Sequence, residues 1–301
     1  MKVISHLASI LSQNKALSRA TLKCLPDWHR HIKVPGIGRL RIRLRRNRSL
    51  WIRHTLTHEW YPLSILKAFV GPTDIVWDVG ANIGLYSRIL VQCLNARHVF
   101  AFEPMSENLP ELRHNLRSGG VENRVTVLPL ALSNRDGTAE FQVDDIQSAS
   151  GALDSVYRGN ASRGRAALDL PPKTEPVECR TIDSVLRDGT AAVPDVMKLD
   201  VEGAERMVLD GGEKFFMDQS PKLLIETHGV EVMKACLEFL FRKGFHVAGC
   251  VPDAWHPTRH MRLSADILNK ITDQYDVHFI AASKRLEDLP VSIERDPRRI
   301  L

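Results

Sequence analysis

Short apolar runs recur along the chain from residue 74 and alternate with stretches of helical spacing. The runs predict strands at 74–79, 98–103, 124–131, 195–200, 222–226, 245–247 and 277–281, with helices at 85–94, 106–118, 201–210 and 230–243. Strands that are apolar throughout are typical of a parallel sheet covered by helices on both faces. We therefore predict an α/β fold with a Rossmann-like, doubly wound and mostly parallel sheet of seven strands. The last two strands should form an antiparallel edge pair.

The chain before residue 71 has a different pattern. Helical spacing predicts an amphipathic helix over 3–24, and strict alternation predicts a half-buried strand over 37–46. The polar face of that strand consists of Arg39, Arg41, Arg43 and Arg45. We expect an N-terminal helix and β extension at 1–70, a main domain at 71–285 and a tail at 286–301.

A region without clear periodicity interrupts the alternation of strands and helices. Residues 134–137 form a predicted turn, and 138–143 are expected to be a strand that pairs back onto the sheet. Residues 144–173 are rich in Ser, Ala, Gly and Asp and have no clear period. So long an unpatterned stretch inside a compact domain is usually a functional lid or a disordered loop, and we expect this one to close over the acceptor.

Composition and charge narrow the class of protein. The chain is 44% apolar and 26% charged, as globular proteins are, and it has no apolar run long enough for a transmembrane helix. Its five cysteines are widely spaced, which argues against a thiolate zinc site or a disulfide framework and favours a cytoplasmic location. Residues 1–54 hold 13 basic residues and one acid, whereas the other 247 residues hold 28 basic and 35 acidic ones.

The strongest chemical signal is the sequence DVGANIG at 78–84, on the first strand–helix turn. Small residues there let a ligand approach the backbone, and open parallel sheets bind ligands at the carboxyl ends of their strands. Glu103 ends the second strand, where a carboxylate can accept hydrogen bonds from ribose hydroxyls. The spacing of Gly80 and Gly84 lacks the G-x-G-x-x-G pattern of a dinucleotide site. Asp78 would repel a pyrophosphate but suits a ligand with a cationic amino-acid end.

Four motifs stand in an order and spacing that one family shares. They are DVGANIG at 78–84, FEP at 102–104, ALSNRDG at 131–137 and KLDVEGAE at 198–205. Together they resemble the FkbM-type S-adenosylmethionine-dependent methyltransferases, and the resemblance covers residues 40–285. The segments 46–53 and 59–62 also look like the part of that family that precedes its first motif. The resemblance implies the class I methyltransferase fold and the cofactor S-adenosyl-L-methionine. It also implies O-methylation of a hydroxyl on a sugar, glycan or natural-product acceptor.

The resemblance also implies a set of cofactor-binding residues at the strand ends. They are Asp78, Gly80, Ala81, Asn82, Gly84, Glu103, Asn108, Ala131, Leu132 and Asp200. Within this set, the residues from Asp78 to Gly84 would line the methionine end and Glu103 would bind the ribose. Adenine contacts would fall near Asn108 and 131–132, and Asp200 would lie beside the transferred methyl group.

Methyl transfer from a sulfonium asks the protein to position the acceptor and to remove its proton. The candidate bases at the strand ends are Asp200, Glu202, Glu226 and His228. Helix capping is the alternative role for the first two, and a structural histidine is the alternative for His228. A divalent ion on Asp200, Glu226 and His228 could also acidify a hydroxyl, although we predict a site without a metal.

The basic N-terminal segment leaves a second function open, RNA methylation, because its arginines could neutralise phosphates. Against this, no Asn-Pro-Pro-Tyr-like motif follows the fourth predicted strand, and no RNA-binding motif is found. A small-molecule or glycan acceptor that bears phosphate or carboxylate would use the same charge, so we expect the strand at 37–46 to form an accessory wall of the acceptor site. A binding protein that retains the fold without catalysis would have lost motif residues such as Asp78, Glu103 and Asp200. A dehydrogenase would need the missing glycine pattern.

Overall fold

The computed structural model describes residues 26–47, 50–51, 56, 59–144, 151–153, 165–166, 169–251, 259–269 and 279–292. The helix expected at 3–24 and most of the stretch 144–173 lie outside these residues. In the part of the chain that is described, no helix combines the length and apolar character needed to cross a bilayer.

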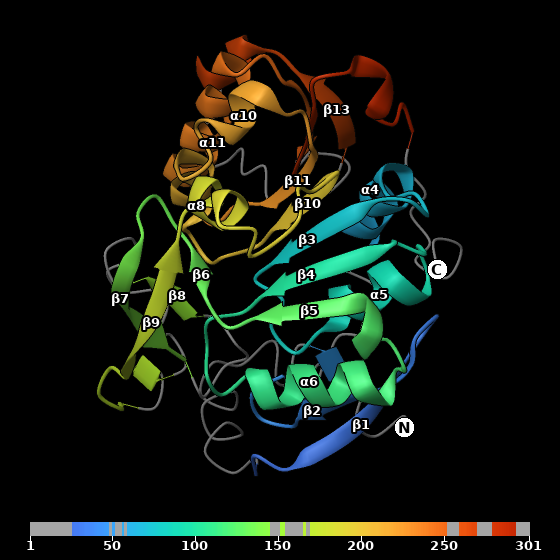
Figure 1. Cartoon of the computed structure of the whole chain (residues 1–301), viewed down its shortest axis with the longest axis vertical. Helices are drawn as coiled ribbons and strands as arrows, with labels where there is room; N and C mark the ends of the chain where they lie inside the picture. Colours follow the sequence, from blue (N-terminus) through green and yellow to red (C-terminus); the bar gives the residue numbers. More distant parts are fainter. Residues whose placement is uncertain are drawn as a thin grey trace.

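An eight-stranded sheet forms the centre of the molecule, in the order β13-β12-β14-β11-β10-β3-β4-β5 (Figure 1). Its parallel strands are β3 (Ile75–Val79), β4 (His98–Phe102), β5 (Val125–Leu128), β10 (Val196–Leu199) and β11 (Lys222–Glu226). The antiparallel strands are β12 (His246–Val251), β13 (Arg259–Leu263) and β14 (Phe279–Ser283). The predicted α/β, doubly wound and mostly parallel fold is confirmed. The sheet has one strand more than the seven expected, because β13 carries two arginines and a histidine among five residues and so shows no apolar run.

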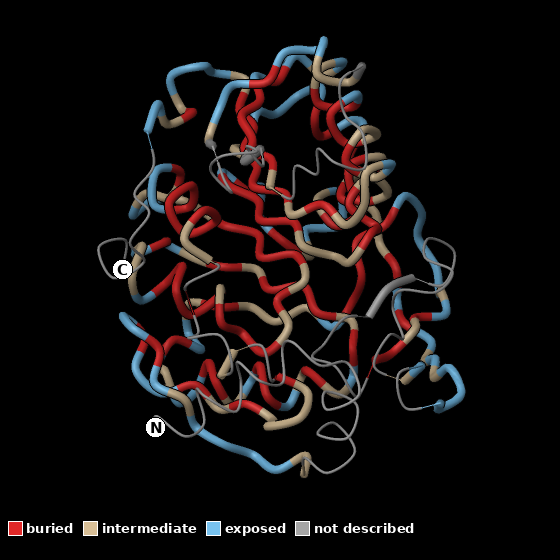
Figure 2. The backbone as a smooth tube through the Cα atoms, turned by 180° about the vertical axis from the view of Figure 1, so that it is seen from behind, coloured by how far each residue is buried: buried red, intermediate tan, exposed pale blue. Residues whose placement is uncertain are grey.

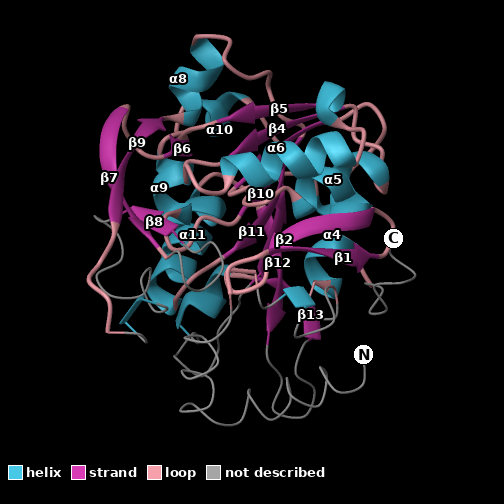
Figure 3. Cartoon of the chain, turned by 90° about the horizontal axis from the view of Figure 1, so that it is seen from below, coloured by secondary structure: helices cyan, strands magenta, loops and turns pink. Residues whose placement is uncertain are grey.

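Helices cover both faces of this sheet (Figure 3). One face carries α4 (Trp60–Phe69), α5 (Leu85–Gln92) and α6 (Leu109–Ser118). The other carries α8 (Ile182–Arg187), α9 (Glu205–Asp210), α10 (Phe215–Asp218) and α11 (Val230–Arg242). Successive side chains of a strand point to opposite faces, so Val76 packs in the first core and Trp77 in the second. Short 3-10 turns lie at Glu122–Arg124, Ala265–Asn269 and Leu286–Asp288. Figure 2 shows that the buried residues run along the central strands.

A separate four-stranded sheet, in the order β6-β9-β7-β8, lies on the side toward which β3, β4 and β5 point (Figure 1). Its strands are β6 (Ala131–Leu132), β7 (Gly137–Val143), β8 (Gly151–Leu153) and β9 (Thr174–Arg180). The strand expected at 138–143 exists, but its expected pairing was wrong: it pairs with β8 and β9 and not with the central sheet. The strand expected over 124–131 is divided between the two sheets at Pro129, which has no N–H to continue a ladder.

The N-terminal segment adds a hairpin of β1 (His29–Val34) and β2 (Gly38–Arg43). Its apolar side chains, including Leu40 and Ile42, pack beside α5 in a third core. Helix α4 comes before the expected domain boundary at residue 70, yet it packs in the same core as the central strands.

The arginines of this segment form ion pairs within the fold. Arg41 Nε lies 2.6 Å from Glu111 Oε2 on α6, and Arg43 Nε lies 3.5 Å from Glu111 Oε1. Arg46 binds Asp27 and Glu107. These three side chains are therefore engaged along α6, and an acceptor would have to compete with acids that already hold them.

Candidate active site

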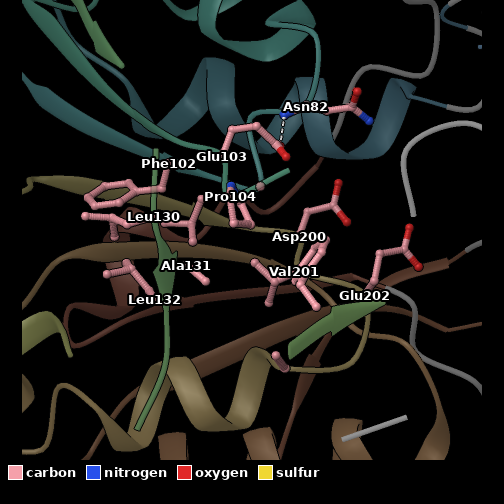
Figure 4. Close-up of a pocket in the computed structure, with 14 residues that line it drawn as sticks. Asn82, Phe102, Glu103, Pro104, Leu130, Ala131, Leu132, Asp200, Val201 and Glu202 are labelled. Atoms are coloured by element: carbon pink, nitrogen blue, oxygen red, sulfur yellow. Dashed lines mark hydrogen bonds between the residues drawn. The ribbon is translucent and has the colours of Figure 1, made fainter. Parts of the chain in front are cut away.

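A cavity lies at the carboxyl ends of β3, β4 and β10, and its empty space, together with the solvent at its mouth, is about 610 Å³. Figure 4 shows apolar side chains (Phe102, Leu130 and Leu132) at one end and the carboxylates of Asp200 and Glu202 at the other. Glu103 lies between them. The other lining residues are Val79, Gly80, Asn82, Pro104, Ala131, Phe141, Val201 and Ala204. The cavity therefore offers an apolar end, a carboxylate in the middle and a charged end.

The glycines of the first motif serve the packing of the protein chain. Gly80 has φ +83°, and a Cβ there would lie 1.8 Å from the carbonyl oxygen of Asp200. Gly84 has φ +84°, and a Cβ there would meet Leu112 Cδ1 at 2.7 Å. Both positions combine the left-handed backbone with a close approach that only glycine allows. The contact permitted at Gly80 brings β3 against the loop after β10, which sets where Asp200 lies in the cavity.

Glu103 is fixed in the cavity by three donors. The backbone N–H of Asn82 donates to its Oε2 at 2.7 Å, and Met105 N and Asn108 Nδ2 donate to its Oε1 at 2.9 and 3.2 Å. Burial raises the pKa of Glu103 to about 7 in spite of these hydrogen bonds. An ionised carboxylate has about four acceptor positions, so the site retains capacity for a ligand hydroxyl.

Asn82 adds a polar atom that suits a ligand donor. Its backbone is left-handed, with φ 51°. Its Oδ1 is buried and, among the described residues, has no hydrogen-bond partner. A buried acceptor without a partner is costly, so a donor from a bound ligand would stabilise it.

Asp78 lies behind the cavity wall and anchors Lys198. It is fully buried, accepts a hydrogen bond from Ser87 Oγ at 2.6 Å, and burial raises its pKa. Lys198 Nζ lies 3.7 Å from Asp78 Oδ1 and 3.2 Å from Asp200 Oδ2. Burial alone would lower the pKa of Lys198, but the charges of Asp200, Asp78 and Glu226 outweigh it and raise that pKa. Lys198 therefore stays protonated and holds the carboxylate of Asp200 in place.

Other residues of the expected cofactor set are divided between the cavity wall and its support. Ala131 and Leu132 line the apolar end. Ala81 packs in the core beneath α5, and Asn108 lies behind Glu103 as one of its donors. Phe141, on β7 of the second sheet, completes the apolar wall.

The charged end brings together the loops that follow β10 and β11. His228 Nε2 lies 3.8 Å from Asp200 Oδ1 and 3.6 Å from Glu202 Oε2, while its Nδ1 lies 2.8 Å from Glu205 Oε1. Burial lowers the pKa of His228, but the hydrogen bond to Glu205 and the charges of Glu202 and Asp200 outweigh it. The net effect raises that pKa to about 10. The imidazole is therefore protonated at neutral pH in the free protein.

Glu226 joins the same group from the end of β11. Burial raises its pKa well above the ordinary value, and the charges of Asp200 and Glu59 add to the effect. One ligand atom each from Asp200, Glu226 and His228 lies within 4.8 Å of the others, so these residues could hold a divalent ion. All four candidate bases thus lie at one end of the molecule's central sheet.

Four further residues at this end had no role in the sequence interpretation: Glu59, Tyr86, Lys198 and Glu205. The Tyr86 hydroxyl donates to Glu59 at the start of α4, and burial raises the pKa of Glu59. Lys198 Nζ lies 4.7 Å from the centre of the Tyr86 ring. Glu59 belongs to the segment 59–62 and Glu205 ends KLDVEGAE, so the motifs contained both residues without indicating their contacts.

The chain matches the family model of the methyltransferase FkbM domain over residues 78–247. It belongs to the FkbM methyltransferase family. This family implies S-adenosyl-L-methionine as the methyl donor, and the resemblance drawn from the four motifs is confirmed.

Two characterised proteins and one solved structure are among those similar to this chain. Hexuronic acid methyltransferase AglP of Haloferax volcanii is 30% identical over 54% of this chain and 60% of its own length. The 31-O-demethyl-FK506 methyltransferase FkbM of Streptomyces tacrolimicus is 30% identical over 53% of this chain and 67% of its own. The crystal structure of methyltransferase FkbM from Methylobacillus flagellatus KT has 17% identity and a TM-score of 0.42, and the match covers 78% of this chain and 53% of that one. The match to AglP thus spans less than two thirds of that protein.

Proposed function

We propose that this protein transfers a methyl group from S-adenosyl-L-methionine to a hydroxyl oxygen of a sugar, glycan or natural-product acceptor. The observation that carries the proposal is the polarity of the cavity. It passes from an apolar end, through Glu103, to a charged end beside His228.

The lining residues fit the parts of this methyl donor. The apolar wall that includes Leu132 and Phe141 suits adenine, and Glu103 can accept ribose hydroxyls. Asn82 Oδ1 and the carboxylate of Asp200 suit the ammonium of the methionine part. We infer that these residues bind the donor, with Asp78, Gly84 and Asn108 supporting them from behind.

When bound, the donor would supply an electrophilic methyl group, and its sulfur would keep the electron pair of the broken sulfur–carbon bond as a neutral thioether. The residues of this chain must then orient the acceptor hydroxyl and receive its proton as the new carbon–oxygen bond forms. His228 Nε2 is the atom that we assign to receive the proton, since it faces Asp200 and Glu202 at the charged end. The imidazole must be neutral to do so, and the positive charge of the bound sulfonium would lower its pKa from the value of about 10 in the free protein. The two carboxylates, with Glu226, can accept hydrogen bonds from neighbouring hydroxyls of a polyol. A positioned base contributes about 10²–10⁴ in rate.

A sugar is the acceptor class that this geometry favours. The carboxyl groups of Asp200, Glu202 and Glu226 can bind hydroxyls, and the names of two relatives mention a hexuronic acid and an O-demethyl compound. Ion pairs between acids of the protein and three arginines, Arg41, Arg43 and Arg46, speak against the RNA alternative.

Two experiments test the proposal. The first is calorimetric titration with S-adenosyl-L-methionine, and the second is a labelled methyl-transfer screen over sugars, lipid-linked glycans, phenols and RNA. We expect saturable binding that weakens in Asp200→Asn and stays unchanged in Asp218→Asn, an exposed acid on α10. Label should appear in a hydroxyl-bearing acceptor. Failure of the wild-type protein to bind the donor would overturn the proposal, and label found only in RNA would favour the alternative.

A further inference from the structure

Glu205 is a buried acid that joins two loops of the charged end. It is the first residue of α9, and its side chain is fully buried. Its Oε1 lies 2.8 Å from His228 Nδ1, 3.0 Å from Gly203 N and 3.4 Å from Val201 N. One carboxylate oxygen therefore connects the loop after β10 with the loop after β11. The described cavity-lining residues do not include Glu205.

The hydrogen bonds define which nitrogen of His228 faces the cavity. Oε1 already receives backbone N–H groups, so it acts as an acceptor and Nδ1 must carry the proton between them. The imidazole must be neutral when it accepts the proton of a hydroxyl, and a neutral imidazole has one donor and one acceptor nitrogen. With Nδ1 as the donor, Nε2 is left as the acceptor, and it is Nε2 that lies near Asp200 and Glu202.

The same carboxylate holds an unusual backbone. Glu202 has φ 54°, in the left-handed region that non-glycine residues rarely adopt, and Gly203 follows with φ 104°. Such conformations persist when the surroundings fix them, and they cluster at functional sites. The N–H groups on either side of Glu202, from Val201 and Gly203, both point at Glu205. Glu205 thus fixes the loop that carries the Asp200 and Glu202 carboxylates.

We propose that Glu205 is a positioning residue for methyl transfer: it fixes the tautomer and orientation of His228 and the backbone of Glu202, so that Nε2 and the two carboxylates meet at the acceptor hydroxyl. This inference rests on the proposed function. A helix-capping role alone would require the backbone hydrogen bonds but not the bond to His228. The two roles therefore differ in what they predict for the imidazole.

Proton NMR of the histidine rings tests, without any acceptor, whether Glu205 fixes the tautomer of His228. A Nδ1 proton that is donated to a buried carboxylate resonates far downfield and exchanges slowly, and loss of one such signal in His228→Gln assigns it. We expect this signal in the wild type and in the control Glu111→Gln, which changes a buried acid on α6. We expect Glu205→Gln to lose the signal and Glu205→Asp, which keeps the charge, to retain a shifted one. An unchanged signal in Glu205→Gln would overturn the proposal.

Once an acceptor is known, kinetics test whether Glu205 positions these groups for methyl transfer. Glu205→Gln should lower kcat at least tenfold, toward the loss of about 10²–10⁴ expected when a base is misplaced, while the dissociation constant of S-adenosyl-L-methionine stays within twofold. Glu205→Asp should recover part of kcat, and if Glu205→Gln does not fold, Glu205→Asp alone should show an intermediate kcat with unchanged donor affinity. Equal kcat in both Glu205 variants and the wild type would contradict the role. If the wild type binds donor but methylates nothing, the proposed function fails, while the NMR result still decides whether Glu205 positions His228.

Discussion

Raising the pH from 7 to 10 should remove stability that the folded protein gains from His228. The pKa of this imidazole is about 10 in the folded protein against 6.5 for an ordinary histidine. A group whose pKa is raised by folding contributes stability that is complete below the unfolded pKa and is lost as the pH rises through the folded pKa. The stabilising contribution of His228 should therefore decline between pH 6.5 and 10.

The structure gives the size of this effect. At 1.36 kcal/mol per pH unit, the pKa rise corresponds to about 5 kcal/mol at low pH, of which about 3–4 kcal/mol disappears between pH 7 and pH 10. The side chain of His228 is 24% exposed, so solvent screening should bring the measured value below this figure.

Urea unfolding at pH 7, 8, 9 and 10 measures the effect in the wild type and in His228→Gln. Other groups also titrate over this range, and their contributions cancel when the two proteins are compared at each pH. The free energy of unfolding should fall more steeply in the wild type, whereas His246→Gln, which changes an exposed histidine on β12, should follow the wild type. Parallel curves for the wild type and His228→Gln would refute the reasoning that the surrounding carboxylates stabilise a charged imidazole.

Four further predictions concern the cavity and its support. Affinity for S-adenosyl-L-methionine should fall as the pH falls through about 7, where Glu103 becomes protonated. In calorimetry, Glu103→Gln should bind the donor more weakly than the wild type, and its affinity should change less with pH. Gly80→Ala should abolish donor binding in a protein that still folds, because the added Cβ displaces the Asp200 backbone; normal binding by calorimetry would contradict this. Lys198→Met should destabilise the fold by about 3–5 kcal/mol in urea unfolding, because it leaves Asp78 buried without its cation. EDTA should leave methyl transfer unchanged, whereas loss of activity that Mg²⁺ restores would show that a divalent ion occupies the strand-end cluster.

The strand pattern was sufficient to predict the architecture, because both faces of the central strands are covered and such strands are apolar throughout. The strand β13 was not predicted, because an edge strand needs no continuous apolar run. The second sheet was not predicted because its strands pair across gaps in the sequence, as β6 does with β9. Periodicity carries no information about which strands pair.

The sequence indicated which candidate side chains would lie together when each of them follows a strand, but it did not indicate contacts that cross between loops. Asp200, Glu202 and His228 follow strands, and carboxyl ends of parallel strands meet at one edge of the sheet. The pairing of Glu205 with His228 joins two loops 23 residues apart, and spacing alone does not reveal it. The expected arginine wall also depended on contacts of this kind, since Glu111 on α6 decides where Arg41 points.

The central claim is that the cavity holds the methyl donor while His228 and its carboxylates direct transfer to an oxygen. The most direct test is to incubate the protein with a sugar acceptor and with S-adenosyl-L-methionine that carries a ¹³C-methyl group. The product is then examined by NMR. The wild type should give a new ¹³C methoxy signal that His228→Gln lowers strongly at unchanged donor affinity. Donor binding without any methoxy signal across the acceptor panel, or label found only on nitrogen or carbon, would contradict the claim.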